Sequence, residues 1–272
     1  MGIWQSAFPI LQRYIPAHRN NRFLRFLDKI SQIYHLMFEN VNYDCENNGE
    51  LLLLKILNNS NNLNCVLDVG ANIGDYSLIA RRVNKKCRII AFEPVPETFN
   101  LLKSNTHNLK IEIHNYALGN KLGKSLISVT NDSTLSTLLD YEQEYAGRNA
   151  EYIEVDVRTG EEFLLGEIDL KEISLLKIDT EGYEPEVLKG FRSHISNVNI
   201  IQFEYGKANL FSKYFLYDYF KDYARDFHIG KLYPKGVKFY QSYNWDLDDL
   251  LGPNIVMVNK NREDLLSLLS RY

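Results

Sequence analysis

A chain of 272 residues is long enough for a single α/β domain with a terminal extension. Because 45% of its residues are hydrophobic, the chain can bury a full core, which excludes a disordered protein. Its formal net charge of −4 argues against a nucleic-acid partner, since such proteins normally present a basic face.

The three cysteines are odd in number and show no CxxC spacing. This pattern suits a reducing compartment and argues against a disulfide framework and a zinc site. No stretch approaches the ~18 consecutive apolar residues that a membrane-spanning helix needs. The first residues also lack the order of a secretory signal. We therefore expect a cytoplasmic protein without a transmembrane segment.

The first sixty residues are expected to form a helical extension. Apolar side chains recur there at helical spacing, namely Phe23, Phe26, Leu27, Ile30, Ile33, Tyr34 and Met37. Because the polar face carries acid as well as base, we expect residues 1–60 to pack on a main domain of residues 61–272. An anchor on a membrane surface is the alternative. A further helix is expected to begin near Glu50.

From residue 63 onward, buried strands alternate with helices. Strands are expected at 64–70, 87–94, 110–119, 172–179 and 198–205, with helices at 74–83, 96–106 and 185–191. This alternation predicts a Rossmann-like, doubly wound, mostly parallel α/β sheet. Residues 123–130 and 150–159 have alternating strand character. The remainder predicts an aromatic helix over 210–227, a hairpin around Pro234–Gly236, a strand at 254–260 and a helix at 263–272.

The segment "VLDVGANIGDYS" (66–77) contains a glycine loop between a strand and a helix. Gly70 and Gly74 allow a tight turn and close approach to a ligand. The pattern is D-x-G-x-x-x-G, whereas a dinucleotide fingerprint requires G-x-G-x-x-G. Asp68, before the first glycine, suits a cationic or amine-bearing ligand better than a pyrophosphate.

Glu93 ends the next strand, nineteen residues beyond Gly74. A carboxylate at that point can accept hydrogen bonds from both hydroxyls of a ribose. Together these residues predict a nucleoside site without a phosphate site, and S-adenosylmethionine is a ligand of that kind. NAD is the second candidate. A generic α/β turn, with Asp68 satisfying loop amides, is the structural alternative.

Four segments carry a family resemblance: "VLDVGANIGDYS", "IIAFEPVPETFNLLKSN", "NYALG" and "LLKIDTEGYEPEVLKG". In this order they closely resemble the FkbM family of S-adenosylmethionine-dependent methyltransferases, over roughly residues 43–260. The resemblance implies a seven-stranded methyltransferase sheet. It also implies O-methylation of a hydroxyl on a sugar, polysaccharide, other glycoconjugate or natural product.

By residue, the resemblance places Asp68, Gly70, Asn72 and Gly74 around the methionine part of the cofactor. It places Glu93 on the ribose, and Asn115 and Ala117 near the adenine. Tyr76 and Pro94 lie in the matching segments and are assigned to cofactor binding with them, as is Asp179. Glu50 is assigned either to the cofactor or to the start of its helix.

The stretch "KIDTEGYEPE" (177–186) contains the candidate catalytic carboxylates. Asp179 ends a central strand, where ligands of doubly wound sheets bind, and a carboxylate there can take the proton of an acceptor hydroxyl. Glu204, at the end of the neighbouring strand, is the second candidate. Glu181 is a catalytic candidate whose structural role is equally open, whereas Glu184 and Glu186 are expected to stabilise a helix start.

No metal site is assigned, but Asp179 and Glu204 together could hold Mg²⁺ or a similar divalent cation. The expected partner is a small-molecule or glycan acceptor, and a homo-oligomer is left open. The aromatic residues of 210–245 suit a glycan but are first expected to fill the core. The alternatives to the methyltransferase are a nicotinamide-dependent oxidoreductase and a non-catalytic cofactor-binding module.

Overall fold

The computed structural model describes residues 2–129, 138, 151–167, 172–252 and 254–270. The chain divides into two compact units, Met1–Val41 and Asn42–Tyr272, each of which is described by itself. Within the described residues, no helix combines the length and the apolar character needed to cross a bilayer.

The first unit consists of helices α1 (Gly2–Ala17) and α2 (Arg22–Phe38). Asn21 caps α2, because its side-chain oxygen accepts hydrogen bonds from the backbone N–H groups of Phe23 and Leu24 at 2.9 and 3.2 Å. No residue of α2 is buried. The helices lie where the apolar spacing predicts them, and the packing of residues 1–60 on the main domain stays a prediction.

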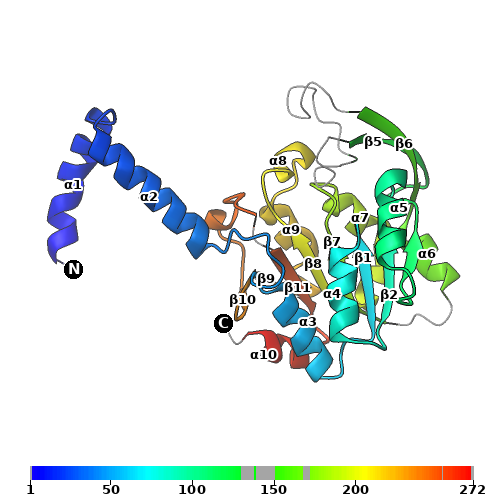
Figure 1. Cartoon of the computed structure of the whole chain (residues 1–272). Coiled ribbons are helices and arrows are strands. Elements are labelled where there is room, and N and C mark those ends of the chain that lie inside the picture. Colours follow the sequence, from blue (N-terminus) through cyan, green and yellow to red (C-terminus); the bar gives the residue numbers. More distant parts are fainter. Residues whose placement is uncertain (1, 130–137, 139–150, 168–171, 253, 271–272) are drawn as a thin grey trace. The chain divides into compact units, whose positions relative to one another are not determined.

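The second unit is built on a central sheet that has eight strands in the described part of the chain, in the order β10-β9-β11-β8-β7-β1-β2-β3 (Figure 1). Neighbours from β8 to β3 are parallel, whereas β11, β9 and β10 pair antiparallel. The strands are β1 (Cys65–Val69), β2 (Arg88–Phe92), β3 (Glu112–His114), β7 (Ile173–Ile178), β8 (Val198–Glu204), β9 (Phe227–Tyr233), β10 (Gly236–Tyr240) and β11 (Asn254–Asn259).

The predicted Rossmann-like class is therefore confirmed, with one strand more than the seven expected. The hairpin predicted around Pro234–Gly236 is also confirmed, since Tyr233 on β9 is the register partner of Gly236 on β10. The second strand of this hairpin joins the sheet as an edge and accounts for the larger count.

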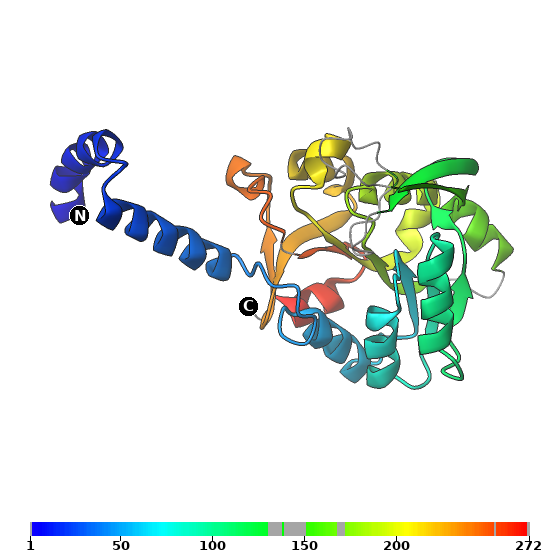
Figure 2. The same ribbon diagram turned by 45° about the horizontal axis from the view of Figure 1, so that its top comes forward.

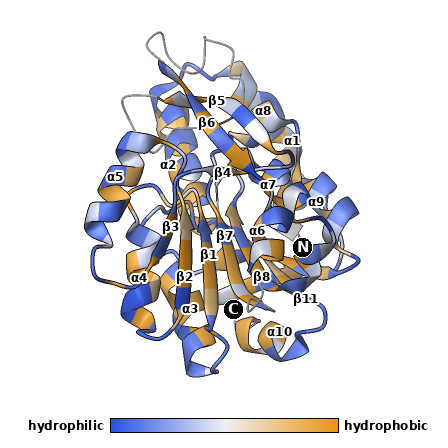
Figure 3. Ribbon diagram, turned by 90° about the vertical axis from the view of Figure 1, so that its right-hand side faces the viewer, coloured by the Kyte–Doolittle hydropathy of each residue, from blue (hydrophilic) through white to orange (hydrophobic). Residues whose placement is uncertain are grey.

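Helices cover both faces of the sheet, as its continuously apolar central strands require (Figure 3). One face packs against α3 (Glu50–Asn59), α4 (Asp75–Val83) and α10 (Glu263–Leu269). Figure 2 shows α3 in blue beside α10 in red. The other face packs against α6 (Gly160–Gly166), α7 (Glu184–Phe191) and α9 (Leu216–Tyr223). Helix α5 (Pro96–Asn105) contributes Leu102 to a small cluster beside β2.

A second sheet of the described residues has the order β4-β6-β5, with β4 (Ala117–Leu118), β5 (Gly123–Val129) and β6 (Glu151–Arg158). Ile127 and Val155 from this sheet pack against Val95, which follows β2. The small sheet thereby comes next to the end of β2. Residues 130 and 150, at the ends of the two predicted strand segments, lie outside the described residues.

The single aromatic helix predicted over 210–227 is wrong. The segment contains a short α8 (Asn209–Ser212) and α9, separated by Lys213 with a left-handed φ of 54°. Asp218 accepts a hydrogen bond from the Phe215 N–H at 3.0 Å and so starts α9 anew. Two short 3₁₀ helices, Arg192–Asn197 and Trp245–Leu247, complete the elements of the described residues.

Candidate functional site

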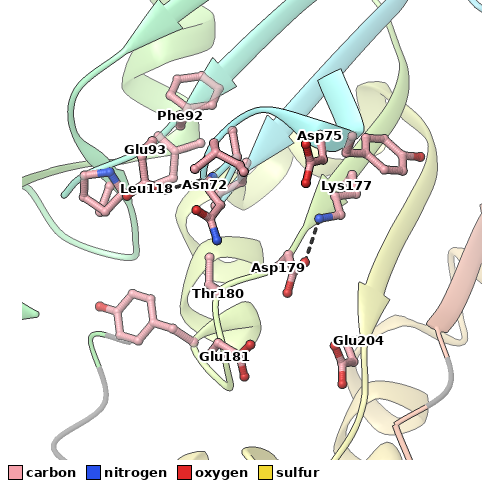
Figure 4. Close-up of a pocket in the computed structure, with 18 of the residues that line it drawn as sticks. Asn72, Asp75, Phe92, Glu93, Leu118, Lys177, Asp179, Thr180, Glu181 and Glu204 are labelled. Atoms are coloured by element: carbon pink, nitrogen blue, oxygen red, sulfur yellow. Dashed lines mark hydrogen bonds and ion pairs between the residues drawn. The ribbon is translucent and has the colours of Figure 1, made fainter. Parts of the chain in front are cut away.

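The carboxyl ends of β1, β2, β7 and β8 surround a cavity of about 610 Å³ (Figure 4). This is where a doubly wound sheet places its ligand. The predicted site residues that line the cavity are Glu50, Gly70, Asn72, Tyr76, Glu93, Pro94, Ala117, Asp179, Glu181 and Glu204. Three others, Asp68, Gly74 and Asn115, are not among the residues that line it.

Gly70 brings the loop after β1 against the end of β7. Its φ is +77°, and an added Cβ would lie only 1.9 Å from the carbonyl oxygen of Asp179. The Asp179 N–H donates to the Val69 carbonyl at 2.9 Å. The loop and Asp179 are therefore in contact only because residue 70 has no side chain.

Asp68 on β1 connects the start of this loop to α4. It is fully buried, and its Oδ2 accepts a hydrogen bond from Ser77 at 2.7 Å. Its Oδ1 has no hydrogen-bond partner within the described part of the chain. Burial raises the pKa of Asp68, although the charge of Lys177 on the neighbouring strand opposes the shift.

Gly74 and Asn115 shape the backbone around the cavity. Gly74, with a φ of +98°, is the residue that precedes α4. The Asn115 side-chain amide donates to the carbonyl groups of Glu93 and Pro94 at 2.9 and 3.0 Å. These two predicted residues therefore position the residues that do line the cavity.

Glu93 is buried at the end of β2. Its Oε2 accepts a hydrogen bond from the Asn72 N–H at 3.0 Å, and its Oε1 accepts one from the Val95 N–H at 2.9 Å. Burial raises the pKa of Glu93 to about 7. Each carboxylate oxygen can accept a second hydrogen bond, so both remain able to receive a diol.

Asp179 is held in place by Lys177. The Lys177 ammonium donates to Asp179 Oδ2 at 2.8 Å and lies 5.2 Å from the centre of the Tyr76 ring. Burial alone would lower the pKa of Lys177, but the carboxylates of Asp179, Asp68 and Glu50 outweigh it, so the pKa is raised. Lys177 therefore stays charged, and the Asp179 side chain remains 40% exposed toward the cavity.

Glu204 and Glu181 add two carboxyl groups to this end of the cavity, opposite Asn72 and Glu93 (Figure 4). Burial raises the pKa of Glu204 to about 8, with further contributions from the charges of Asp179 and Glu181. A carboxyl group with such a pKa exchanges its proton near neutral pH.

The two later acids of the predicted helix start make structural contacts. Glu184 Oε1 accepts hydrogen bonds from the N–H groups of Thr180 and Gly182 at 2.9 and 3.1 Å. Glu186 pairs with Lys189 at 2.6 Å. Glu184 thus fixes the turn that carries Glu181, and Glu186 lies on the surface of α7.

Several cavity residues were missed from the sequence, among them Tyr43, Cys45, Ile127 and Tyr183. The fully buried Gln202, which contacts two residues of the lining, was missed as well. Gln202 donates to Glu50 and accepts a hydrogen bond from the Tyr76 hydroxyl at 3.2 Å. A side-chain amide within an apolar strand was a usable signal for Gln202, whereas Tyr43 and Cys45 lie in an irregular segment without any pattern.

Two further expectations concern metals and aromatic residues. Among the described residues, no group of three or more His, Cys, Asp or Glu could hold a metal ion. Tyr219 and Tyr233 fill the core, whereas Tyr217 and Trp245 are exposed. No described residue of 210–245 lines the cavity.

Comparison with known proteins gives a family match. The family model of the methyltransferase FkbM domain matches residues 68–227, which is more than half of the chain. Among solved structures, methyltransferase FkbM from Methylobacillus flagellatus KT aligns with 20% identity and a TM-score of 0.43, over 72% of this chain and 44% of that one.

Curated relatives match about half of the chain. Methyltransferase 1 of Beauveria bassiana is 31% identical over 143 residues, 46% of this chain and 57% of that protein. The hexuronic acid methyltransferase AglP of Haloferax volcanii is 28% identical over 49% of this chain and 52% of its own. The 31-O-demethyl-FK506 methyltransferase FkbM of Streptomyces tacrolimicus is 30% identical over 46% and 58%. The chain thus spans between half and three fifths of the length of these relatives.

Proposed function

The chain belongs to the FkbM methyltransferase family, and from this we propose that it transfers a methyl group from S-adenosylmethionine to a hydroxyl of a sugar, polysaccharide, other glycoconjugate or natural product. One observation carries the proposal. A single cavity combines Glu93, at the end of β2, with Asp179 and Glu204, at the ends of β7 and β8.

The cavity fits the proposed cofactor in size and in chemistry. Its volume of about 610 Å³ lies within the range of small-molecule sites. The Glu93 carboxylate is available to a ribose diol, and the Gly70 loop offers a close backbone approach. The acidic lining suits the positive charge of a sulfonium. When bound, S-adenosylmethionine would supply an activated methyl group.

The acceptor hydroxyl must lose its proton during the transfer, and two carboxyl groups are available for this. We assign proton acceptance to Glu204, because its pKa of about 8 is matched to neutral solution. One oxygen of Asp179 is engaged by Lys177, which leaves the other free to orient the acceptor hydroxyl. Glu181 is the third acid in this part of the cavity lining, beside Asp179 and Glu204.

The three acids of the cavity lining also indicate which acceptors the site can bind. Asp179, Glu181 and Glu204 all line the cavity, and Lys177 is already paired with Asp179. A carboxylate-bearing acceptor would meet like charge here. Although one relative is a hexuronic acid methyltransferase, we propose an uncharged or cationic acceptor for this chain.

The first experiment is a calorimetric titration of the full chain with S-adenosylhomocysteine, with NAD⁺ as the comparison ligand. We expect saturable binding of S-adenosylhomocysteine alone. Glu93→Ala should weaken it by roughly tenfold or more, since a buried hydrogen-bond acceptor is lost. Glu97→Ala, an exposed acid on the first turn of α5, is the matched control. Binding of NAD⁺ would favour the oxidoreductase alternative, and binding of neither ligand would contradict the proposal.

A second experiment tests turnover. Methyl transfer is measured with neutral, amino and uronic sugars in parallel, each with and without added Mg²⁺. We expect transfer to neutral or amino sugars in preference to uronic acids. Cofactor binding without transfer to any hydroxyl acceptor would favour a non-catalytic binding module.

A further inference from the structure

Helix α2 has an uncovered apolar face. With 100° per residue, eight side chains fall within one half of the helix: Phe23, Phe26, Leu27, Ile30, Ile33, Tyr34, Met37 and Phe38. Each of them is at least 44% exposed, so nothing within the first unit covers this face. Helix α1 adds exposed Phe8, Ile10 and Tyr14.

The charges of this segment differ in sign from those of the remaining chain. Residues 1–38 contain five basic side chains and one acid, Asp28, which gives a net charge of +4. Because the whole chain carries −4, residues 39–272 carry −8. On α2, Arg22 and Lys29 lie along one border of the apolar face, and Arg25 lies farther round on the polar side.

We propose that the N-terminal unit binds the surface of an anionic lipid membrane, with α2 lying in the plane of the interface. A wide apolar face rich in aromatic residues enters the boundary between headgroups and acyl chains, while bordering cations pair with anionic headgroups. The long Arg and Lys side chains can place their apolar stems along the same face.

A second copy of the chain is a poorer occupant of this face. A two-stranded coiled coil uses two of every seven positions, whereas about half of α2 is apolar. Pairing two such helices would also bring their cations together, with only Asp28 in each to compensate. The proposal stands on the first unit alone and does not depend on the methyltransferase function.

The test is flotation of the full chain with vesicles. One set contains phosphatidylglycerol and phosphatidylcholine in equal parts, and the other contains phosphatidylcholine alone. We expect binding to the anionic vesicles only, and weakening of that binding as salt concentration rises. The double variant Arg22→Gln/Lys29→Gln should bind about fivefold more weakly for each charge removed.

Variants of the apolar face give a second readout. Phe26→Ser/Ile30→Ser/Met37→Ser should lose binding by roughly tenfold or more. Leu36→Ser is the matched control, because Leu36 is exposed on the opposite half of the same helix. It should retain binding within about twofold of the unmodified chain. Circular dichroism checks that the variants remain helical.

Three results would overturn the proposal. The first is an absence of binding to either vesicle type, and the second is equal binding to both. The third is a dimer in light scattering without lipid that the triple variant converts to a monomer, since the face would then belong to a second copy. The first result has a further reading. If the unmodified chain binds neither vesicle type and the triple variant unfolds at a lower temperature, the apolar face packs on the chain's own main domain.

Discussion

The charges of Asp179, Glu181 and Glu184 all act on the carboxyl group of Glu204, and this arrangement predicts a pH dependence of activity. If Glu204 accepts the proton as we propose, it must be unprotonated for methyl transfer, and kcat/KM should rise with pH and level off above about 8. Replacing Asp179 with Asn removes a charge that raises this pKa, so the rise should move to lower pH. The pH profile of kcat/KM is measured for the unmodified chain and for Asp179→Asn. An unchanged midpoint in the variant would contradict the influence of Asp179 on the Glu204 pKa.

Glu204→Gln should abolish this rise and lower kcat by roughly two to four orders of magnitude, as expected when a general base is lost. Gln keeps the size and the hydrogen-bonding capacity of the side chain but cannot accept a proton. Steady-state kinetics at saturating cofactor measures the effect. Activity close to that of the unmodified chain would shift the proton acceptor to Asp179.

The same pKa predicts a pH dependence of stability. The folded state raises the Glu204 pKa from the ordinary 4.5 to about 8. Its contribution to the free energy of unfolding is therefore fully present below pH 4.5 and is lost as pH rises through 8. Relative to the unmodified chain, Glu204→Gln should gain roughly 3 kcal/mol or less between pH 5 and pH 9. Denaturant unfolding at both values measures this, and Glu97→Gln should show no such gain.

Much of the site could be predicted at the residue level from strand-end acids. Asp179, Glu93 and Glu204 follow apolar runs, and parallel strands bring such ends to one edge. The sequence could not separate residues on the cavity wall from those behind it. Asp68 and Asn115 support the wall through Ser77 and through backbone carbonyls, and these contacts depend on side-chain directions that spacing does not determine.

Among the elements, the loop between β1 and α4 tolerates the least change. Gly70→Ala would place a methyl group 1.9 Å from the Asp179 carbonyl oxygen at a positive φ. We expect a loss of roughly 1–3 kcal/mol in unfolding free energy and loss of cofactor binding. Gly166→Ala, whose Cβ would meet nothing within 4 Å, is the matched control. Thermal unfolding and calorimetry measure both effects, and equal behaviour of the two variants would count against this role of Gly70.

Local patterns predict these elements unevenly. Strands β1, β7 and β8 and the β9–β10 hairpin follow from apolar runs and turn residues. The break between α8 and α9 does not, because aromatic residues occur on both sides of it. Lys213 adopts a left-handed conformation, and Asp218 starts a new helix. A hydrogen bond to one side chain thus decides a boundary that hydrophobic spacing leaves open.

For the whole molecule, ligand binding and stability should be linked. S-adenosylhomocysteine at a hundredfold excess over its Kd should add about 2.7 kcal/mol to the unfolding free energy and raise the Tm by several degrees. Phe26→Ser/Ile30→Ser/Met37→Ser should keep this shift, since no side chain of α2 lines the cavity. Thermal scans measure it. A shift that disappears in this variant would instead make the N-terminal unit part of the cofactor site.

The position of β11 has a consequence for the order in which the chain acquires its structure. β11 is the last strand along the described chain, yet it pairs with both β8 and β9. Until β11 is paired, the β9–β10 hairpin has no strand of the central sheet to join. The outer edge of β8 meanwhile presents unpaired backbone groups to neighbouring chains. The parallel strands around the cavity can pair before β11 does, so we expect a folding stage in which the half of the sheet that carries the cavity is formed while the edge of β8 is still open.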